Sequence, residues 1–200
     1  GKGSQQVDQE KPNNESPSTW EKISDKSKIM YEEVSGKWSS ELWDIENNDS
    51  LTTEKKVTRV SVIGATACAA IAIQPIPFAD IFILVPAQAF FATRIAAIRG
   101  VPVTKEDSYE LLKQIMGIIG MGMIAQQIAI GIWKLGTFGM GGLLTLPLVF
   151  SLTYGLLSAC DFYYANKAKG VEVTNNELKA HFKKMKKEGA KKYKEEKAQE

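Results

Sequence analysis

The sequence predicts an all-α protein with two apolar helical hairpins, residues 55–99 and 107–164, flanked by an amphipathic helix at each end. Three observations support this fold class. Apolar residues of the flanking segments recur at steps of three and four, which is the helical period. Ser or Thr followed three positions later by Glu or Asp recurs as a helix-start signal. Residues 115–160 carry a single charged side chain, Lys134, so the centre of the chain is apolar.

The charged residues are unevenly distributed along the 200-residue chain. Residues 1–54 carry 6 Lys and 12 Asp or Glu, whereas residues 161–200 carry 11 Lys and 7 Asp or Glu. The net charge of +2 is therefore a cancellation between an acidic N-terminal part and a basic C-terminal part. This composition excludes collagen, a fully disordered chain and a multi-span transporter.

Few residues are suited to catalysis or to metal binding. The single histidine, His181, lies in a lysine-rich segment, and Cys68 and Cys160 lie in apolar segments. Such cysteines are typical of buried small hydrophobes, and a disulfide or a reactive thiol is the alternative. No glycine-rich phosphate loop followed by Lys-Ser or Lys-Thr is present. We therefore expect that the protein is not an enzyme and that it has no catalytic, cofactor-binding or metal-binding residues.

The N-terminal part is predicted to contain a disordered tail, residues 1–17, and an acidic amphipathic helix, residues 18–46. The tail has too few apolar side chains to offset the entropy of ordering. Ser18 and Glu21 have the spacing of a capping box. The helix packs either on the rest of the protein or on a partner, through an apolar stripe formed by Trp20, Ile23, Met30, Val34 and Trp38.

The first hairpin has two apolar runs around a proline-containing turn. Each run is shorter than the roughly 20 residues that cross a bilayer, so a re-entrant, an interfacial or a buried hairpin is expected. Small residues at every fourth position allow close helix packing, for example Gly64, Cys68 and Ala72. The predicted turn is formed by Pro75 and Pro77, which interrupt the helix, and by Asp80, which caps the next one.

The second hairpin contains the best transmembrane candidate, because residues 140–160 include no charged side chain. Aromatic residues are frequent where a helix leaves the bilayer, and lysines flank the cytoplasmic side. The distribution of basic residues therefore predicts that both flanks of the hairpin are cytoplasmic. The expected lipid-interface residues in and after this hairpin are Trp133, Tyr163, Tyr164, Lys167 and Lys169.

The C-terminal segment, residues 174–200, is predicted to be a basic helix that starts at a capping box of Thr174 and Glu177. Three interpretations of its lysines remain open. The helix is solvated, or it docks on anionic lipid headgroups through residues such as Lys183 and Lys184, or it binds nucleic acid. Interleaved glutamates and the absence of arginine weaken the last of these, so no nucleic-acid partner is expected.

Residues from about 57 to 173 resemble a known bacterial protein family. The resemblance rests on the segment Pro75–Asp80, on Arg94–Thr104, which includes Gly100, and on the glycine-rich residues 117–131. The family has no known function, often accompanies Era-like GTPase domains and includes inner-membrane proteins of the YcjF type. The resemblance implies an all-α, membrane-associated domain over residues 55–173, with a GTPase as partner and with Gly100 as a helix C-cap.

The sequence therefore leads to three functional hypotheses. The first is a non-enzymatic, membrane-associated helical protein of the bacterial inner membrane that acts as an anchor or adaptor, with a GTPase or another protein as its partner. The second is a soluble helical bundle with a buried apolar hairpin that inserts into a membrane on a trigger. The third is an accessory subunit of a larger membrane complex or oligomer, in an organelle inner membrane if the N-terminus arises by cleavage of a targeting segment.

Overall fold

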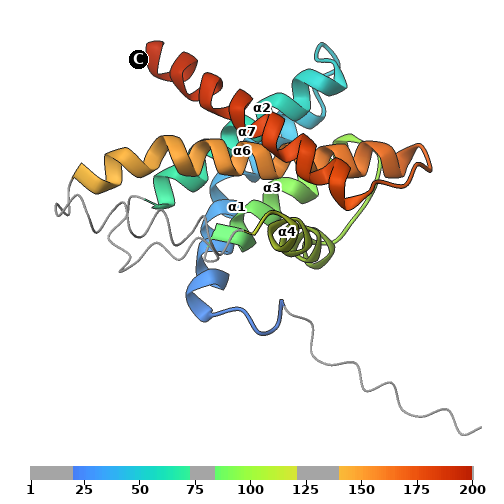
Figure 1. The fold of residues 1–200 in the computed structure, drawn as a ribbon, viewed down its shortest axis with the longest axis horizontal. Helices are drawn as coiled ribbons and strands as arrows, with labels where there is room; N and C mark the ends of the chain where they lie inside the picture. Colours follow the sequence, from blue (N-terminus) through green and yellow to red (C-terminus); the bar gives the residue numbers. More distant parts are fainter. Residues whose placement is uncertain (1–19, 73–83, 121–139, 200) are drawn as a thin grey trace, which may run out of the picture.

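The computed structural model of the chain describes residues 20–72, 84–120 and 140–199, with side chains from Leu146 onward in the last range. These parts contain six α-helices and no strand, so the all-α prediction is confirmed. The helices shown in Figure 1 are α1 (Asp25–Glu46), α2 (Thr53–Ala72), α3 (Val85–Ile98), α4 (Lys105–Ile119), α6 (Met140–Ala168) and α7 (Asn175–Ala198).

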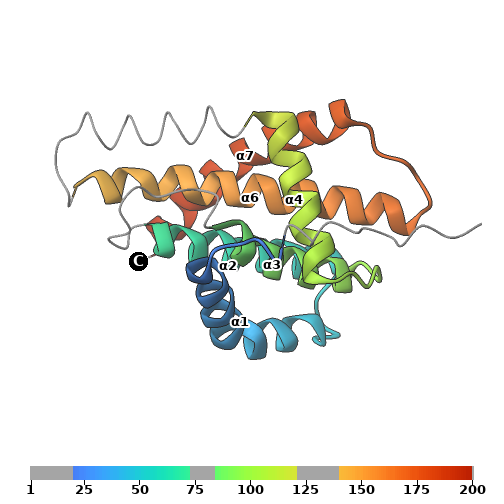
Figure 2. The ribbon, with the colours of Figure 1, turned by 90° about the horizontal axis from the view of Figure 1, so that it is seen from below.

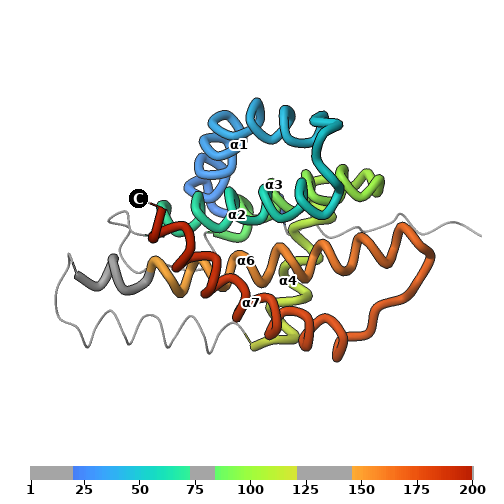
Figure 3. Tube along the Cα trace, turned by 90° about the horizontal axis from the view of Figure 1, so that it is seen from above, coloured from blue at the N-terminus to red at the C-terminus, as the bar shows by residue number. Residues whose placement is uncertain are grey.

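Helix α6 runs along the length of the molecule and lies between its other layers. Figure 2 shows α2 and α3 on one side of α6 with α1 beyond them, whereas α7 crosses α6 obliquely, from the side away from α2 at its start to the side of α2 at the C-terminus. Figure 3 shows the same order from the other direction, and α4 crosses α6 in both views. In Figure 1 the acidic helix α1 lies below α6 and the C-terminal half of the basic helix α7 lies above it, so the two helices are exposed on different sides of the molecule.

The helices start where side chains can accept the unpaired amides of the first turn. Thr104 forms a capping box with Asp107, and Thr174 forms the predicted one with Glu177. The N-terminal helix differs from the prediction, because α1 begins at Asp25 instead of residue 18. Its cap is Ser24, whose hydroxyl accepts the Ser27 amide at 3.2 Å, and the preceding residues form a turn.

Among the described residues, three left-handed glycines end helices, and two of them, Gly100 and Gly170, set the direction of the described segment that follows. Gly100, with φ +75°, follows α3, and the Val101 amide donates to the Ala96 carbonyl at 2.9 Å. Gly170, with φ +71°, ends α6 in the same way. Side chains other than glycine rarely adopt this backbone conformation. The expected helix end at Gly100 is thereby confirmed.

The core is built around α6, because residues 149–160 are all buried by neighbouring helices. The prediction of close packing at Gly64 is confirmed, since a Cβ atom there would lie 2.7 Å from Leu157 Cδ1. Helices α2 and α3 contact each other, whereas α4 crosses α6. Cys68 and Cys160 are buried free thiols, as expected.

Several predicted features fall outside the described residues. These are the N-terminal tail, residues 1–17, the cap at Ser18, the hairpin turn at Pro75, Pro77 and Asp80, and the interfacial Trp133.

Candidate functional site

One face of α7 carries a continuous row of exposed lysines. Lys183, Lys187, Lys191 and Lys194 follow one another at steps of four, four and three, with Lys184 beside them. Residues at these spacings share one face of a helix. We call these five residues the lysine face. All five side chains are exposed, on the face of α7 opposite to its buried residues Leu178 and Phe182.

The opposite face of α7 is packed against α6. Phe150 on α6 contacts Tyr193 on α7, with ring centroids 5.4 Å apart, and Phe162 stacks on His181 at 4.5 Å. Position 150 therefore pairs with 193 and position 162 with 181, so the two helices are antiparallel. The buried side chains on the α7 side of this contact are Leu178 and Phe182.

Two glycines bring the backbones of α6 and α7 unusually close. A Cβ atom at Gly189 of α7 would lie 3.0 Å from the Ser151 Cα of α6. A Cβ atom at Gly155 of α6 would lie 3.0 Å from the Phe182 ring and 3.2 Å from the Lys186 backbone nitrogen. Real Cβ atoms rarely have such short contacts, so larger side chains at these positions would push the helices apart.

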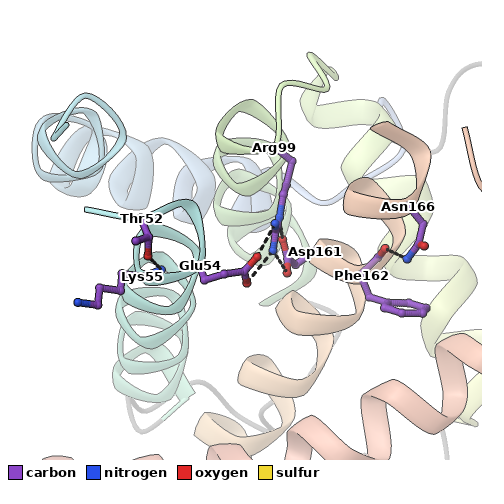
Figure 4. A network of polar contacts seen from close by, with 7 residues as sticks. All are labelled: Thr52, Glu54, Lys55, Arg99, Asp161, Phe162 and Asn166. Carbon is purple, nitrogen blue, oxygen red and sulfur yellow. Dashed lines mark hydrogen bonds and ion pairs between the residues drawn. The ribbon is translucent and has the colours of Figure 1, made fainter. Parts of the chain in front are cut away.

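The other side of α6 is joined to α2 and α3 by charged and polar contacts. Figure 4 shows Arg99, at the end of α3, between Asp161 of α6 and Glu54 of α2. Arg99 Nε donates to Asp161 Oδ1 at 2.6 Å, and its Nη1 donates to Glu54 Oε1 at 2.8 Å. The hydrogen bond from Arg99 holds the pKa of Glu54 below its ordinary value. One guanidinium thus joins three helices.

Further polar contacts join α3 to α6 and to the N-terminal helix α1. Gln88 Nε2 of α3 donates to Thr153 Oγ1 at 3.1 Å inside the core. Arg94 of α3 forms a bidentate ion pair with Glu46 at the end of α1. Helices α1, α2, α3 and α6 are therefore connected by a chain of ion pairs and hydrogen bonds.

Within the described residues, one helix has the length and apolar character needed to cross a membrane. It is the 23-residue segment Leu146–Ala168 of α6, and 67% of its most apolar window is buried inside the protein. A core helix of a soluble protein has the same properties. Length and composition alone therefore do not distinguish a membrane span from a core helix.

The predicted lipid-interface residues differ in their surroundings. Lys167, Lys169, Lys183 and Lys184 are exposed. Tyr163 is half-buried, with the Lys167 ammonium 6.0 Å from its ring centroid. Tyr164 is buried, and its hydroxyl shares a hydrogen bond of 2.9 Å with Ser108 of α4. The lysines are thus accessible to a bilayer, whereas Tyr164 contacts the protein interior in this structure.

The predicted partner-facing stripe of the N-terminal helix packs on the protein itself. Trp20, Met30 and Val34 are buried, and Ile23 and Trp38 are half-buried against the core. This is the first of the two arrangements that the sequence allowed.

Trp20 in particular lies within an internal cluster of aromatic residues. Its ring makes edge contacts with Tyr31 at 5.1 Å and with Tyr109 at 5.4 Å. The Lys105 ammonium lies at about the same distance from the ring centroids of Trp20 and Tyr31, which adds cation–π contacts to this cluster.

The structure adds surface residues that the sequence prediction missed. Ile29 and Trp43 of α1 are 56% and 59% exposed, although both are large and apolar. Their spacing of fourteen residues places them on the same outer face of α1, and helical periodicity could have identified them. The same periodicity would have added Lys187, Lys191 and Lys194 to the lysine face.

The titratable groups near α7 include the only histidine of the chain. Burial lowers the pKa of His181, and Lys184 lowers it further, while Asp161 acts in the opposite direction.

The cysteines and acidic residues offer no reactive or metal-binding group in the described residues. Burial raises the pKa of the Cys68 thiol to about 12. Within the described parts of the chain, no group of three or more His, Cys, Asp or Glu side chains could hold a metal ion.

Comparisons with known proteins give no relative: no protein-family model, curated protein or solved structure matches the chain. The resemblance to the GTPase-associated family therefore stays a prediction.

Proposed function

We propose that the protein is a non-enzymatic, membrane-associated helical module that docks on an anionic bilayer surface through the lysine face of α7. The observation that carries the proposal is the row of five exposed lysines, which lies opposite the buried stripe of the same helix. Each basic residue near an anionic surface contributes about 1 kcal/mol of attraction. The exposed Lys167 and Lys169 at the end of α6 add to this attraction.

Peripheral docking fits the α6–α7 packing better than a membrane-spanning α6. Helix α7 contacts α6 from Phe150 to Phe162 and carries nine lysines. A lysine at the centre of a bilayer costs roughly 2.5–3.5 kcal/mol or more. Helix α6 could therefore enter the hydrocarbon only after α7 had left it. Insertion of the 107–164 hairpin on a trigger is the second candidate function, supported by the length and the burial of the apolar segment of α6.

The side of the molecule that carries α1 suits an adaptor. In this orientation α1 points away from the bilayer and presents Ile29 and Trp43 to the cytoplasm. Exposed tryptophan is a frequent anchor of protein interfaces. We place the protein at the cytoplasmic face of a bacterial inner membrane. A GTPase is the first partner to test, because of the family resemblance of residues 57–173, by cross-linking in membranes with and without Trp43→Ala.

Vesicle co-sedimentation tests the docking surface. The full chain is expected to sediment with vesicles of equal parts phosphatidylglycerol and phosphatidylcholine, and not with phosphatidylcholine alone. Changing Lys183, Lys187, Lys191 and Lys194 to Gln should abolish most of this binding, because it removes the attraction to the headgroups.

A variant of α1 that removes three lysines controls for the loss of charge. Helix α1 carries Lys26, Lys28 and Lys37, and their joint replacement by Gln removes charge from a different side of the molecule. That variant should bind at least as well as the original chain. Equal binding by the α7 variant and the original chain, or no binding by the original chain, would contradict the proposal.

A further inference from the structure

Helix α7 has two distinct faces, and both suit a membrane interface. The lysine face is exposed, while an apolar stripe of Leu178, Phe182, Met185 and Tyr193 lies against α6. A helix with lysines on one face and large apolar side chains on the other is typical of helices that lie in the plane of a bilayer surface. In the present arrangement this stripe is covered by α6.

The contacts that hold α7 differ in kind from those that join α1, α2 and α3 to one another and to α6. Arg94 and Arg99 connect α1, α2, α3 and α6 by bidentate ion pairs. Two ion pairs of α7 each join residues of α7 itself, Lys191 with Glu188 at 3.5 Å and Lys192 with Glu195 at 3.7 Å. Among the described residues, α7 contacts α6 through apolar side chains, through the stacking of His181 on Phe162 and through close packing at Gly155 and Gly189, and it also contacts α4. A bilayer can replace apolar contacts, but it cannot replace the Arg99 ion pairs.

Helix α7 also carries its own N-terminal cap. The Thr174 hydroxyl accepts the Glu177 amide, and the Glu177 carboxylate accepts the Thr174 amide, each at 3.2 Å. The segment before it is exposed from Lys167 to Glu172 and contains the left-handed Gly170. The helix start therefore does not depend on α6, and the connection is open to solvent.

From these observations we infer that α7 exchanges its contact with α6 for a contact with an anionic bilayer surface. The lysines engage the headgroups, and the apolar stripe turns from α6 into the acyl region. The apolar stripe of α7 stays buried in this exchange, and the attraction of the lysines to the headgroups offsets the exposure of the α6 side chains that α7 covered, among them Phe150 and Phe162. The exchange uncovers the side of α6 that carries Ser151 and Gly155, and α1, α2 and α3 stay joined to α6. This inference rests on the proposed docking of the lysine face.

A distance measurement between spin labels tests the exchange. Labels are attached at Thr66→Cys on α2 and Ala190→Cys on α7, two exposed positions on different helices that both contact α6. The native thiols are fully buried, which protects them from labelling. The distance distribution should be narrow in solution and with phosphatidylcholine vesicles, and should lengthen on vesicles containing phosphatidylglycerol.

The possible outcomes separate the two proposals. An unchanged distribution on protein that sediments with anionic vesicles would overturn the exchange and leave the docking intact. Protein that fails to sediment would overturn the docking, and the exchange with it.

A cross-linked variant gives a second, independent readout. Phe162→Cys with His181→Cys places two thiols where stacked rings lie 4.5 Å apart, one on each helix. Closing them with a short bis-maleimide locks α7 on α6. The locked protein should bind anionic vesicles several-fold more weakly than the same variant before cross-linking. Equal binding of the two forms would show that α7 does not need to leave α6.

Discussion

At the scale of single residues, the chain concentrates its polar connections in a few side chains. Arg99 alone joins α3 to α2 and α6, and both Arg99 and Asp161 have side chains that are only 15% exposed. Hydrogen bonds between such charged groups are among the strong ones in proteins. These contacts fix the part of the molecule that surrounds α6 on the side away from α7.

His181 gives the α6–α7 contact a specific dependence on pH. Its folded pKa is lowered, chiefly by burial and also by Lys184, and Asp161 opposes this only in part. Below about pH 6.5 the His181 side chain therefore binds a proton more readily in the unfolded chain than in the folded protein. We expect the free energy of unfolding to fall as the pH decreases from about 6.5 toward the folded pKa, and to be fully retained above that range.

Urea unfolding over a series of pH values measures this effect. Since His181 is the only histidine of the chain, His181→Phe should flatten the stability profile in the window just below pH 6.5 while keeping an aromatic ring against Phe162. If the variant keeps the original dependence of the unfolding free energy on pH, a group other than His181 is responsible for that dependence.

At the scale of helices, local signals are predictable from the sequence and distant contacts are not. The capping boxes at Thr104 and Thr174 depend on residues three positions apart, so they can be identified from the sequence. Arg99 meets Glu54 and Asp161 across 45 and 62 positions, and no local pattern specifies such pairs. Ser18 has the spacing of a cap, but the structure uses Ser24 six residues later.

The candidate site is predictable in part for a related reason. An aromatic residue after an apolar run suits a lipid interface and a helix interface equally, because both are apolar with a polar edge. The sequence pattern therefore assigns Tyr164 to the bilayer, although Ser108 of α4 binds its hydroxyl. The same reasoning places the lysines of α7 correctly on the surface, because helical periodicity separates them from Leu178 and Phe182.

Close packing at Gly64 gives a prediction for the contact between α2, α3 and α6. Gly64→Val places carbon atoms where Leu157 and Phe91 already lie, since even a Cβ would be 2.7 Å and 2.9 Å from them. Overpacking of this kind costs about 1–3 kcal/mol of unfolding free energy. Denaturant unfolding of the purified variant measures the loss.

Gly36 of α1 provides the matched control for this substitution. It is an exposed helical glycine, and a Cβ atom added there would meet nothing within 4 Å. Gly36→Ala should stabilise the protein by about 0.5–1 kcal/mol, because alanine loses less backbone entropy on folding. A Gly64→Val variant as stable as the original chain would contradict the tight three-helix packing.

At the scale of the whole molecule, charge is separated across the layers. Helix α7 carries nine lysines and four glutamates, and α1 on a different side of the molecule carries six acidic residues and three lysines. A molecule with this distribution is oriented by an anionic surface before it touches that surface. The attraction also weakens as salt is added, because screening shortens its range.

The orientation of the protein on the bilayer tests docking through α7 most directly. A fluorophore is attached at Ala180→Cys, an exposed position on the same side of α7 as Lys183 and Lys187, or at Gly36→Cys on α1. Each labelled protein is bound to vesicles that contain phosphatidylglycerol and a lipid with a nitroxide on its headgroup. Docking through the lysine face predicts strong quenching at position 180 and little at position 36. Equal quenching at both positions, or stronger quenching at position 36, would contradict it.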